Sequence, residues 1–119
     1  MAKMELMTDE LKKNLKSFIE LDEIDSEDLT VSIVFFDPFT SWTWYVFGGV
    51  IEQNGDVEFY GFVTSPLVPK GEFGYFLLSD LQSLERNILG EVFGIERDIN
   101  FVETKACKLL PKYLDSNNR

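Results

Sequence analysis

Histidine is absent from this 119-residue chain, and cysteine occurs once, as Cys107. A single thiol excludes a disulfide within the chain. Without histidine or a second cysteine there is no Cys/His zinc site and no imidazole base to activate a nucleophile. We therefore expect no cofactor and no metal, and interpret Cys107 as a small buried hydrophobe. The scarcity of cysteine favours a cytoplasmic protein over a secreted one.

Long hydrophobic runs are also missing. No stretch approaches the roughly 18 apolar residues of a membrane span, and Met1–Thr8 lacks the apolar segment of a signal peptide. With 45% hydrophobic and 14% aromatic residues, the chain is still too rich in core-forming side chains to be disordered. We expect no membrane contact and a single domain over residues 1–119, with a frayed C-terminus from about residue 115.

Basic residues are missing from the 53 positions between Lys16 and Lys70, which hold ten acidic residues. The other 66 positions hold 11 acidic and 11 basic residues, so this segment carries the whole net charge of −10. Such a field repels phosphates and argues against direct nucleic-acid binding. It either keeps the protein soluble or fits a basic protein partner.

The acidic residues are densest in the segment 20–28, where six of nine residues are acidic. We predict a partner-binding acidic surface on this segment and on the turn region around residue 55. Its candidate residues are Glu20, Asp22, Glu23, Asp25, Glu27, Asp28, Glu52, Asp56 and Glu58.

Apolar spacing and turn residues predict an α+β domain of two layers. It has a mostly antiparallel sheet of four to five strands, an N-terminal helix and one to two later helices. The predicted elements are a helix over 8–21, strands over 29–36, 42–51, 57–63, 73–78 and 94–101, a helix from 79 to about 90, and a last helical turn within 104–110.

Glycines mark two features of the predicted sheet. Asn54 and Gly55 predict a type I′ hairpin between the second and third strands, because both central residues of that turn need positive φ. Gly48 and Gly49 indicate a β-bulge or a close approach of two backbones inside the second strand.

The second predicted helix follows Ser79, a good N-cap residue. Leu81, Leu84 and Ile88 recur at helical spacing and should pack on the sheet. Gly90 lies where a left-handed C-cap would end the helix.

Aromatic residues concentrate in the centre of the chain, where 13 of 17 lie between residues 35 and 76. In the second strand, Trp42 and Trp44 lie on one face and Tyr45 and Phe47 on the other. A small two-layer domain cannot cover both faces unless loops contribute. One row should therefore be partly exposed, and Trp42, Trp44 and Tyr45 are candidates for a partner-binding aromatic face.

Three segments carry a resemblance: VFFDPFTSWTWYV (34–46), EFGYFLLSDL (72–81) and GIERDINF (94–101). Their order and separations are similar to those of a family of small acidic proteins of unknown function that plasmids and phages carry. The resemblance covers about residues 29–103 and implies the α+β fold and a mobile-element context, without catalytic residues. Relatives in such a context sometimes lie beside genes that counter host defence.

The charged residues of these motifs are the remaining candidates for chemistry, chiefly Asp37, Glu96, Arg97 and Asp98. In a strand, Glu96 and Asp98 share one face with Arg97 opposite, and a metal site would need a third carboxylate from elsewhere. The plainer interpretation is structural: Asp37 begins a turn and Arg97 pairs with a neighbouring acid. We do not expect an enzyme.

Two main hypotheses remain open. The first is an acidic inhibitor or decoy of a host nucleic-acid-handling defence protein, of the anti-restriction or anti-CRISPR type, bound through a basic partner surface. The second is a small binding or regulatory module whose aromatic sheet face recognises a peptide or self-associates as a homodimer. A metal-dependent carboxylate enzyme is the third and weakest hypothesis.

Overall fold

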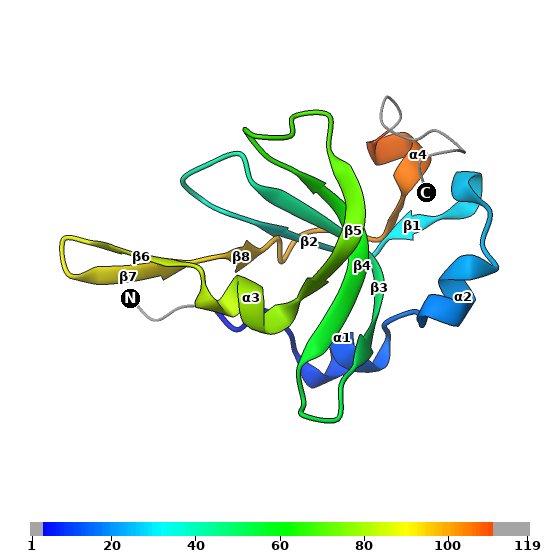
Figure 1. Cartoon of the computed structure of the whole chain (residues 1–119), viewed down its shortest axis with the longest axis horizontal. Coiled ribbons are helices and arrows are strands. Elements are labelled where there is room, and N and C mark those ends of the chain that lie inside the picture. The colour runs from blue at the N-terminus through cyan, green and yellow to red at the C-terminus, as the bar shows by residue number, and fades with distance from the viewer. Residues whose placement is uncertain (1–3, 111–119) are drawn as a thin grey trace.

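A computed structural model describes residues 4–110 and shows an α+β fold (Figure 1). In chain order the elements are α1 (Asp9–Lys13), α2 (Phe18–Asp22), η1 (Ser26–Asp28), β1 (Thr30–Val31), β2 (Ile33–Phe36), β3 (Thr43–Ile51), β4 (Val57–Thr64), β5 (Glu72–Leu77), α3 (Leu78–Ser83), β6 (Glu85–Ile88), β7 (Glu91–Gly94), β8 (Glu96–Arg97), β9 (Thr104–Lys105) and α4 (Ala106–Leu109).

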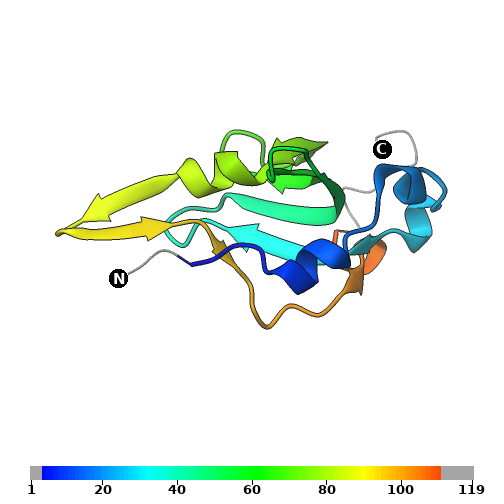
Figure 2. The ribbon, with the colours of Figure 1, turned by 90° about the horizontal axis from the view of Figure 1, so that it is seen from below.

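The centre of the fold is a five-stranded antiparallel sheet with the strand order β5-β4-β3-β2-β8. Two smaller antiparallel pairs, β1–β9 and β6–β7, lie beside it. The β6–β7 hairpin extends from one end of the molecule, and α2 lies at the other (Figures 1 and 2). The predicted α+β class and the mostly antiparallel sheet are confirmed.

The predicted helix over 8–21 is instead two short helices. Thr8 caps α1, its hydroxyl accepting a hydrogen bond from Leu11 N at 3.2 Å. Ser17 then starts α2 with a capping box: its hydroxyl accepts from Glu20 N, and the Glu20 carboxylate accepts from Ser17 N, both at 3.2 Å. Because Ser17 takes an extended backbone to form this cap, the helix cannot run through it.

Gly48 and Gly49 of β3 lie where a β-bulge and a close approach of two backbones, the two predicted alternatives, occur together. The β3–β4 register shifts between Val46 and Gly48. Gly49 N donates to Lys16 O at 2.9 Å, so the chain before α2 crosses β3 at backbone distance. A Cβ on Gly48 would lie 2.3 Å from the same Lys16 oxygen. The bulge and the close approach are both confirmed, and they anchor to the sheet the chain that leads into the acidic segment 20–28.

The β3–β4 hairpin is confirmed, but its turn type is not. Gly55 is left-handed at φ +88°, whereas Asn54 has no positive φ. Gly55 N donates to Glu52 O at 2.9 Å, and Glu52 N donates to Asp56 O at 2.8 Å. This is a three-residue loop with a type I turn and a left-handed glycine, which also matches the twist of the strands.

The second predicted helix begins at Leu78, with Leu77 rather than Ser79 as its N-cap residue, and the prediction is wrong beyond residue 83. The chain leaves α3 and forms the β6–β7 hairpin, whose turn residues Leu89 and Gly90 have φ of +51° and +85°. Gly90 is thus left-handed as predicted, but in a two-residue hairpin turn rather than a helix C-cap. Leu81 is 2% exposed, while Leu84 and Ile88 are 48% and 39% exposed and are not core residues.

Apolar side chains form two clusters. The first includes Trp44 and Val46, and the second includes Phe47 and half-buried Tyr45. Residues that alternate along β3 therefore pack in different clusters, with α1, α3 and the N-terminal segment contributing to one and α2 and α4 to the other. The sequence predicts that one row is partly exposed unless loops cover it; in the structure one residue of each row, Trp42 or Tyr45, is half-buried, while Trp44 and Phe47 are buried.

The remaining predicted elements form in shorter pieces. The strand over 29–36 is divided at Ser32 into β1 and β2, and the strand over 94–101 is reduced to β8. Cys107 lies on α4 and is half-buried rather than buried, with its Sγ 3.5 Å from Glu27 O. The residues predicted to fray, from about 115 to 119, lie outside the described part of the chain.

Candidate functional site

A cavity of about 360 Å³ lies between the β2–β3 loop and the base of the β6–β7 hairpin. Two chain segments that are far apart in the sequence form its walls, and their side chains are mostly aromatic or aliphatic. The lining residues are Asp37, Phe39, Thr40, Trp42, Trp44, Leu84, Glu85, Arg86, Phe93, Gly94 and Ile95.

An ion pair, a cation–π contact and an edge-to-face ring contact hold the hairpin over this cavity. Arg86 Nη2 on β6 donates to Asp37 Oδ2 at 2.9 Å. The Arg86 guanidinium carbon also lies 5.6 Å from the centroid of the Phe39 ring, within the range of a cation–π contact. Phe39 meets Phe93 of β7 edge to face, with the ring centroids 5.2 Å apart. These contacts make the hairpin one wall of the cavity.

Asp37 is the residue that organises the β2–β3 loop. Its Oδ1 accepts a hydrogen bond from Phe39 N at 2.9 Å, as the predicted turn requires. Its side chain is only 13% exposed, whereas that of Arg86 is 46% exposed. The carboxylate therefore fixes the loop with one oxygen and the hairpin with the other.

Both tryptophans of the chain line the cavity. Trp42 and Trp44 stack with centroids 5.7 Å apart and an interplanar angle of 24°. Trp44 is buried in the core, and Trp42 is half-buried. Tyr45, which alternates with Trp44 along β3, packs in the other cluster, so the three predicted aromatic site residues do not form one face.

Sequence reasoning missed three residues of this site: Phe39, Arg86 and Phe93. The first lies in a predicted turn, and the second was assigned to a helix that does not form. A signal for the hairpin was present, because β-branched Ile88 and Val92 flank Gly90 as strand residues flank a turn.

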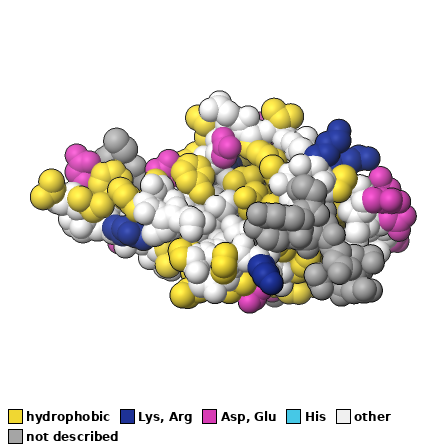
Figure 3. Space-filling model, turned by 90° about the horizontal axis from the view of Figure 1, so that it is seen from above, with side chains coloured by type: hydrophobic (Ala, Val, Ile, Leu, Met, Phe, Trp, Pro, Cys, Tyr) yellow, Lys and Arg dark blue, Asp and Glu magenta, His cyan; other side chains and the backbone are white. Residues whose placement is uncertain are grey.

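The acidic segment 20–28 lies at the opposite end of the molecule from the hairpin, on α2 and η1. Figure 3 shows acidic side chains gathered at this end, on the right of the view. All six predicted residues are exposed: Glu20, Asp22, Glu23, Asp25, Glu27 and Asp28.

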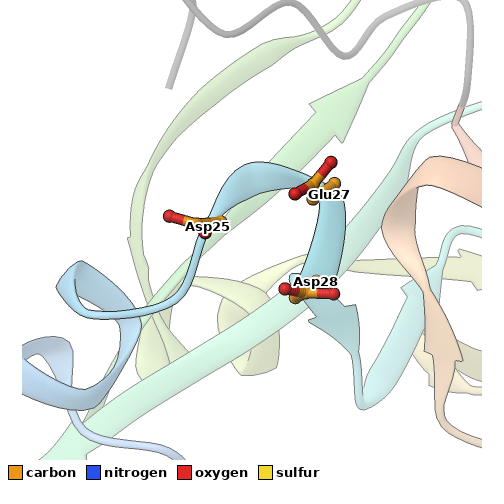
Figure 4. A group of neighbouring side chains, drawn as sticks. All are labelled: Asp25, Glu27 and Asp28. Atoms are coloured by element: carbon orange, nitrogen blue, oxygen red, sulfur yellow. The ribbon is translucent and has the colours of Figure 1, made fainter.

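Three of these carboxylates lie close together on the η1 turn (Figure 4). Oxygens of Asp25, Glu27 and Asp28 all lie within 4.8 Å of one another. Asp28 also pairs with Lys105 of β9 at 3.4 Å, an exposed contact that contributes little to stability. The three groups are fully on the surface, and we assign no metal ion to them.

The other predicted acidic residues lie on the β3–β4 hairpin, away from η1 (Figure 1). Glu52 is exposed and Glu58 is half-buried on β4. Asp56 is engaged by α3: its Oδ2 accepts from Ser79 Oγ at 2.6 Å, and its Oδ1 accepts from Ser79 N and Val57 N. The bond from the Ser79 hydroxyl is the main cause that lowers the pKa of Asp56; desolvation opposes it, and the bonds from the two amides lower the pKa further.

The motif residues of β8 hold the N-terminal segment. The Arg97 guanidinium donates to the backbone oxygens of Glu5 and Leu6 rather than to the acid that the sequence suggested. Asp98 lies beyond the end of β8, where its Oδ1 accepts from Asn100 N at 3.0 Å. Glu96 is half-buried and pairs in register with Phe36.

Arg97 and Asp98 also line a second cavity of about 220 Å³, between α1 and the end of β8. Their side-chain hydrogen bonds hold backbone groups: Arg97 holds the N-terminal segment, and Asp98 holds the turn that follows β8. The cavity between the β2–β3 loop and the β6–β7 hairpin, which we call the Trp42–Arg86 cavity, is different. It combines aromatic stacking surfaces, the Asp37–Arg86 ion pair, the Thr40 hydroxyl and the Glu85 carboxylate. These groups suit the binding of a ligand or a side chain.

The chain belongs to a family described as "Protein of unknown function (DUF2958)", whose model matches residues 6–119. No curated protein and no solved structure matches it. Within residues 4–110, no helix has the length and apolar character needed to cross a membrane.

Proposed function

We propose that this chain is a small acidic binding protein that acts as an inhibitor or decoy of a host nucleic-acid-handling defence protein, of the restriction or CRISPR effector type. The observation that carries the proposal is the acidic end of the molecule, where the six carboxylates of segment 20–28 lie exposed on α2, on η1 and on the link between them. Such a surface can occupy the Lys/Arg channel that phosphates would otherwise fill. The action requires no catalysis, and such a target would place the chain in the cytoplasm.

The spacing of the carboxylates supports a partner more than a role in solubility. Two like charges 4 Å apart repel by about 1 kcal/mol even in bulk water. Three carboxylates within 4.8 Å on one short turn therefore repel one another, and within residues 4–110 only Asp28 among them has an ion-pair partner, the exposed Lys105. Lysine and arginine side chains of a partner would relieve this repulsion, whereas a merely solubilising surface gains nothing from such close packing.

The motifs at 34–46, 72–81 and 94–101 support the biological setting. They resemble those of small acidic proteins carried by plasmids and phages, and a mobile element benefits from blocking host nucleases. This part of the proposal rests on the resemblance alone.

The proposal is tested with a charge-reversed variant in which Asp22, Glu23 and Glu27 are replaced by lysine. These residues make no side-chain contact that stabilises a helix end in the described structure, so the fold should survive. Wild-type protein immobilised on a resin should retain a basic host protein from a lysate at low salt, and should displace labelled DNA or guide RNA from it. The variant should associate more slowly, and the difference should shrink as salt rises.

The matched control reverses three exposed acidic residues that lie outside positions 17–69: Glu5, Glu72 and Glu91. It therefore has the same net charge as the first variant. It should bind nearly as wild type does. Equal loss in both variants would show that net charge alone matters. Unchanged binding in the first variant would show that the acidic end is only a solvated surface.

The Trp42–Arg86 cavity favours a second candidate function, a binding or regulatory module that recognises a peptide or self-associates as a homodimer. Its walls are mostly apolar, so binding there should depend only weakly on salt. A steep salt dependence of partner binding distinguishes the first function from this one.

A further inference from the structure

We propose that the cavity between the β2–β3 loop and the β6–β7 hairpin binds a small, uncharged, planar aromatic group that carries a hydrogen-bond acceptor. The proposal goes beyond the role of the acidic end and does not depend on it, because the two features lie at opposite ends of the molecule (Figures 1 and 2).

The shape and walls of the cavity favour a flat ring. Its volume of about 360 Å³ is at the lower end of the roughly 300–1,000 Å³ of small-ligand pockets. Phe39, Trp42, Trp44 and Phe93 supply four aromatic rings, arranged as a stacked pair and an edge-to-face pair. Phe39 is 47% exposed and Trp42 is half-buried, so both retain ring surface that a guest can cover. Ring pairs prefer offset or edge contacts, and walls of this kind offer both.

The charges at the cavity decide against an ionic guest. An aromatic pocket with a carboxylate is the usual seat of an organic cation. Here the Arg86 guanidinium already occupies the position of such a cation, 5.6 Å from the centroid of the Phe39 ring and 2.9 Å from the Asp37 carboxylate. A second cation would be repelled by Arg86, and an anion would meet Asp37 and Glu85. An uncharged group avoids both costs.

Arg86 also explains the need for an acceptor on the guest. A guanidinium has five N–H donors, and the bond to Asp37 uses one of them, at Nη2. No other hydrogen bond of this guanidinium is formed within residues 4–110, and the side chain is 46% exposed at the cavity wall. A carbonyl oxygen on the edge of the ring would accept from it without disturbing the ion pair.

The two tryptophans make this site directly observable, since the chain has no others. Each gives one indole N–H signal in a ¹H–¹⁵N spectrum, and a ring bound in the cavity should shift both. The probe is benzamide, a planar ring that carries a carbonyl. For a ligand of this size we expect a dissociation constant of about millimolar order. Cyclohexanecarboxamide removes the planar ring, benzoate adds a negative charge, and toluene removes the acceptor. Benzylammonium replaces the acceptor with a positive charge.

We expect each of these four probes to bind about fivefold or more weakly than benzamide, the size of effect that a ring pair or one hydrogen bond supplies. N-acetyl-L-phenylalaninamide tests the source of the ring. Tighter binding of this capped amino acid than of benzamide would identify an aromatic side chain of a protein as the guest. Equal or weaker binding would identify a free small molecule.

Trp42→Ala should weaken benzamide binding about tenfold or more, read from the signal that Trp44 retains. Tyr75→Ala removes a 62% exposed aromatic side chain outside the cavity and should leave the affinity unchanged. If Trp42→Ala fails to fold, the probe series on the wild-type protein decides alone. Tightest binding of benzylammonium, benzoate or cyclohexanecarboxamide, equal binding of toluene, or no shift with benzamide would each overturn the proposal.

Discussion

The boundary between α3 and the β6–β7 hairpin can be tested by two leucine substitutions. A helix through residue 88 would bury both Leu81 and Leu84, whereas in the structure Leu81 is 2% exposed and Leu84 is 48% exposed. Leu81 packs in the cluster that contains Phe35 and Phe59, and Leu→Ala at such a site costs about 2–5 kcal/mol of unfolding free energy. Full burial of a leucine contributes about 1.5–3 kcal/mol, so half-exposed Leu84 should lose about 1 kcal/mol or less.

The measurement is urea unfolding of wild type, Leu81→Ala and Leu84→Ala, with the slope m fitted for each, since equal slopes would show that the unfolded states are alike. Leu81→Ala should lower the midpoint strongly and Leu84→Ala only slightly. Equal losses in the two variants would refute the assignment of residues 84–94 to an exposed hairpin and restore the longer helix.

Three further predictions concern local contacts. Ser79→Ala should raise the pKa of Asp56 toward its ordinary value, as an NMR titration of the carboxyl carbon would show. The pKa of Asp56 is lower in the folded than in the unfolded protein, so this bond stabilises the fold above the unfolded pKa, and the effect is lost as pH falls through the folded pKa. The unfolding free energies of wild type and variant should therefore converge in acid. Gly48→Ala should cost about 1–3 kcal/mol in urea unfolding, since its Cβ would press on Lys16 O. Gly90→Ala should cost about 1 kcal/mol from its positive φ alone, because nothing lies within 4 Å of the added carbon.

Each of these has an outcome that would contradict it. An unchanged Asp56 titration in the Ser79 variant would show that the hydroxyl does not bond to this carboxylate in solution. A neutral Gly48 substitution would mean that the crossing of the α1–α2 segment over β3 is looser than the hydrogen bond to Gly49 implies. A stabilising Gly90 substitution would mean that the turn does not hold a left-handed residue.

The elements that could be predicted from sequence are those with a local physical signal. Asn54 and Gly55 mark a hairpin because few residues tolerate left-handed backbone. Gly48 marks a site where any Cβ would clash. The β6–β7 hairpin has a weaker local signal, Ile88 and Val92 flanking Gly90, because its turn also places Leu89, a residue that rarely adopts positive φ, beside Gly90.

The cavity could not be predicted for a different reason. Asp37 and Arg86, which join its two walls, are 49 residues apart in the chain, and only the tertiary fold brings them together. Sequence reasoning found Asp37, Trp42 and Trp44 as separate candidates, because a turn acid and alternating tryptophans are visible locally. It assigned Arg86 no role, since a charged residue on a supposed helix indicates only a solvated surface.

The separation of the acidic end from the cavity makes the two proposals independent. The molecule is 46 Å long, and the two features lie toward opposite ends of its longest axis (Figure 1). Charges on the surface are screened beyond about 8–10 Å at physiological salt, so reversing carboxylates on η1 should not alter the potential at Arg86. Effects of substitutions that far apart generally add. A variant altered at both ends should therefore lose partner binding in a salt-dependent way and lose ligand binding at the cavity. Each loss should be as large as in the single-site variant. A smaller combined loss would indicate that one partner contacts both ends at once.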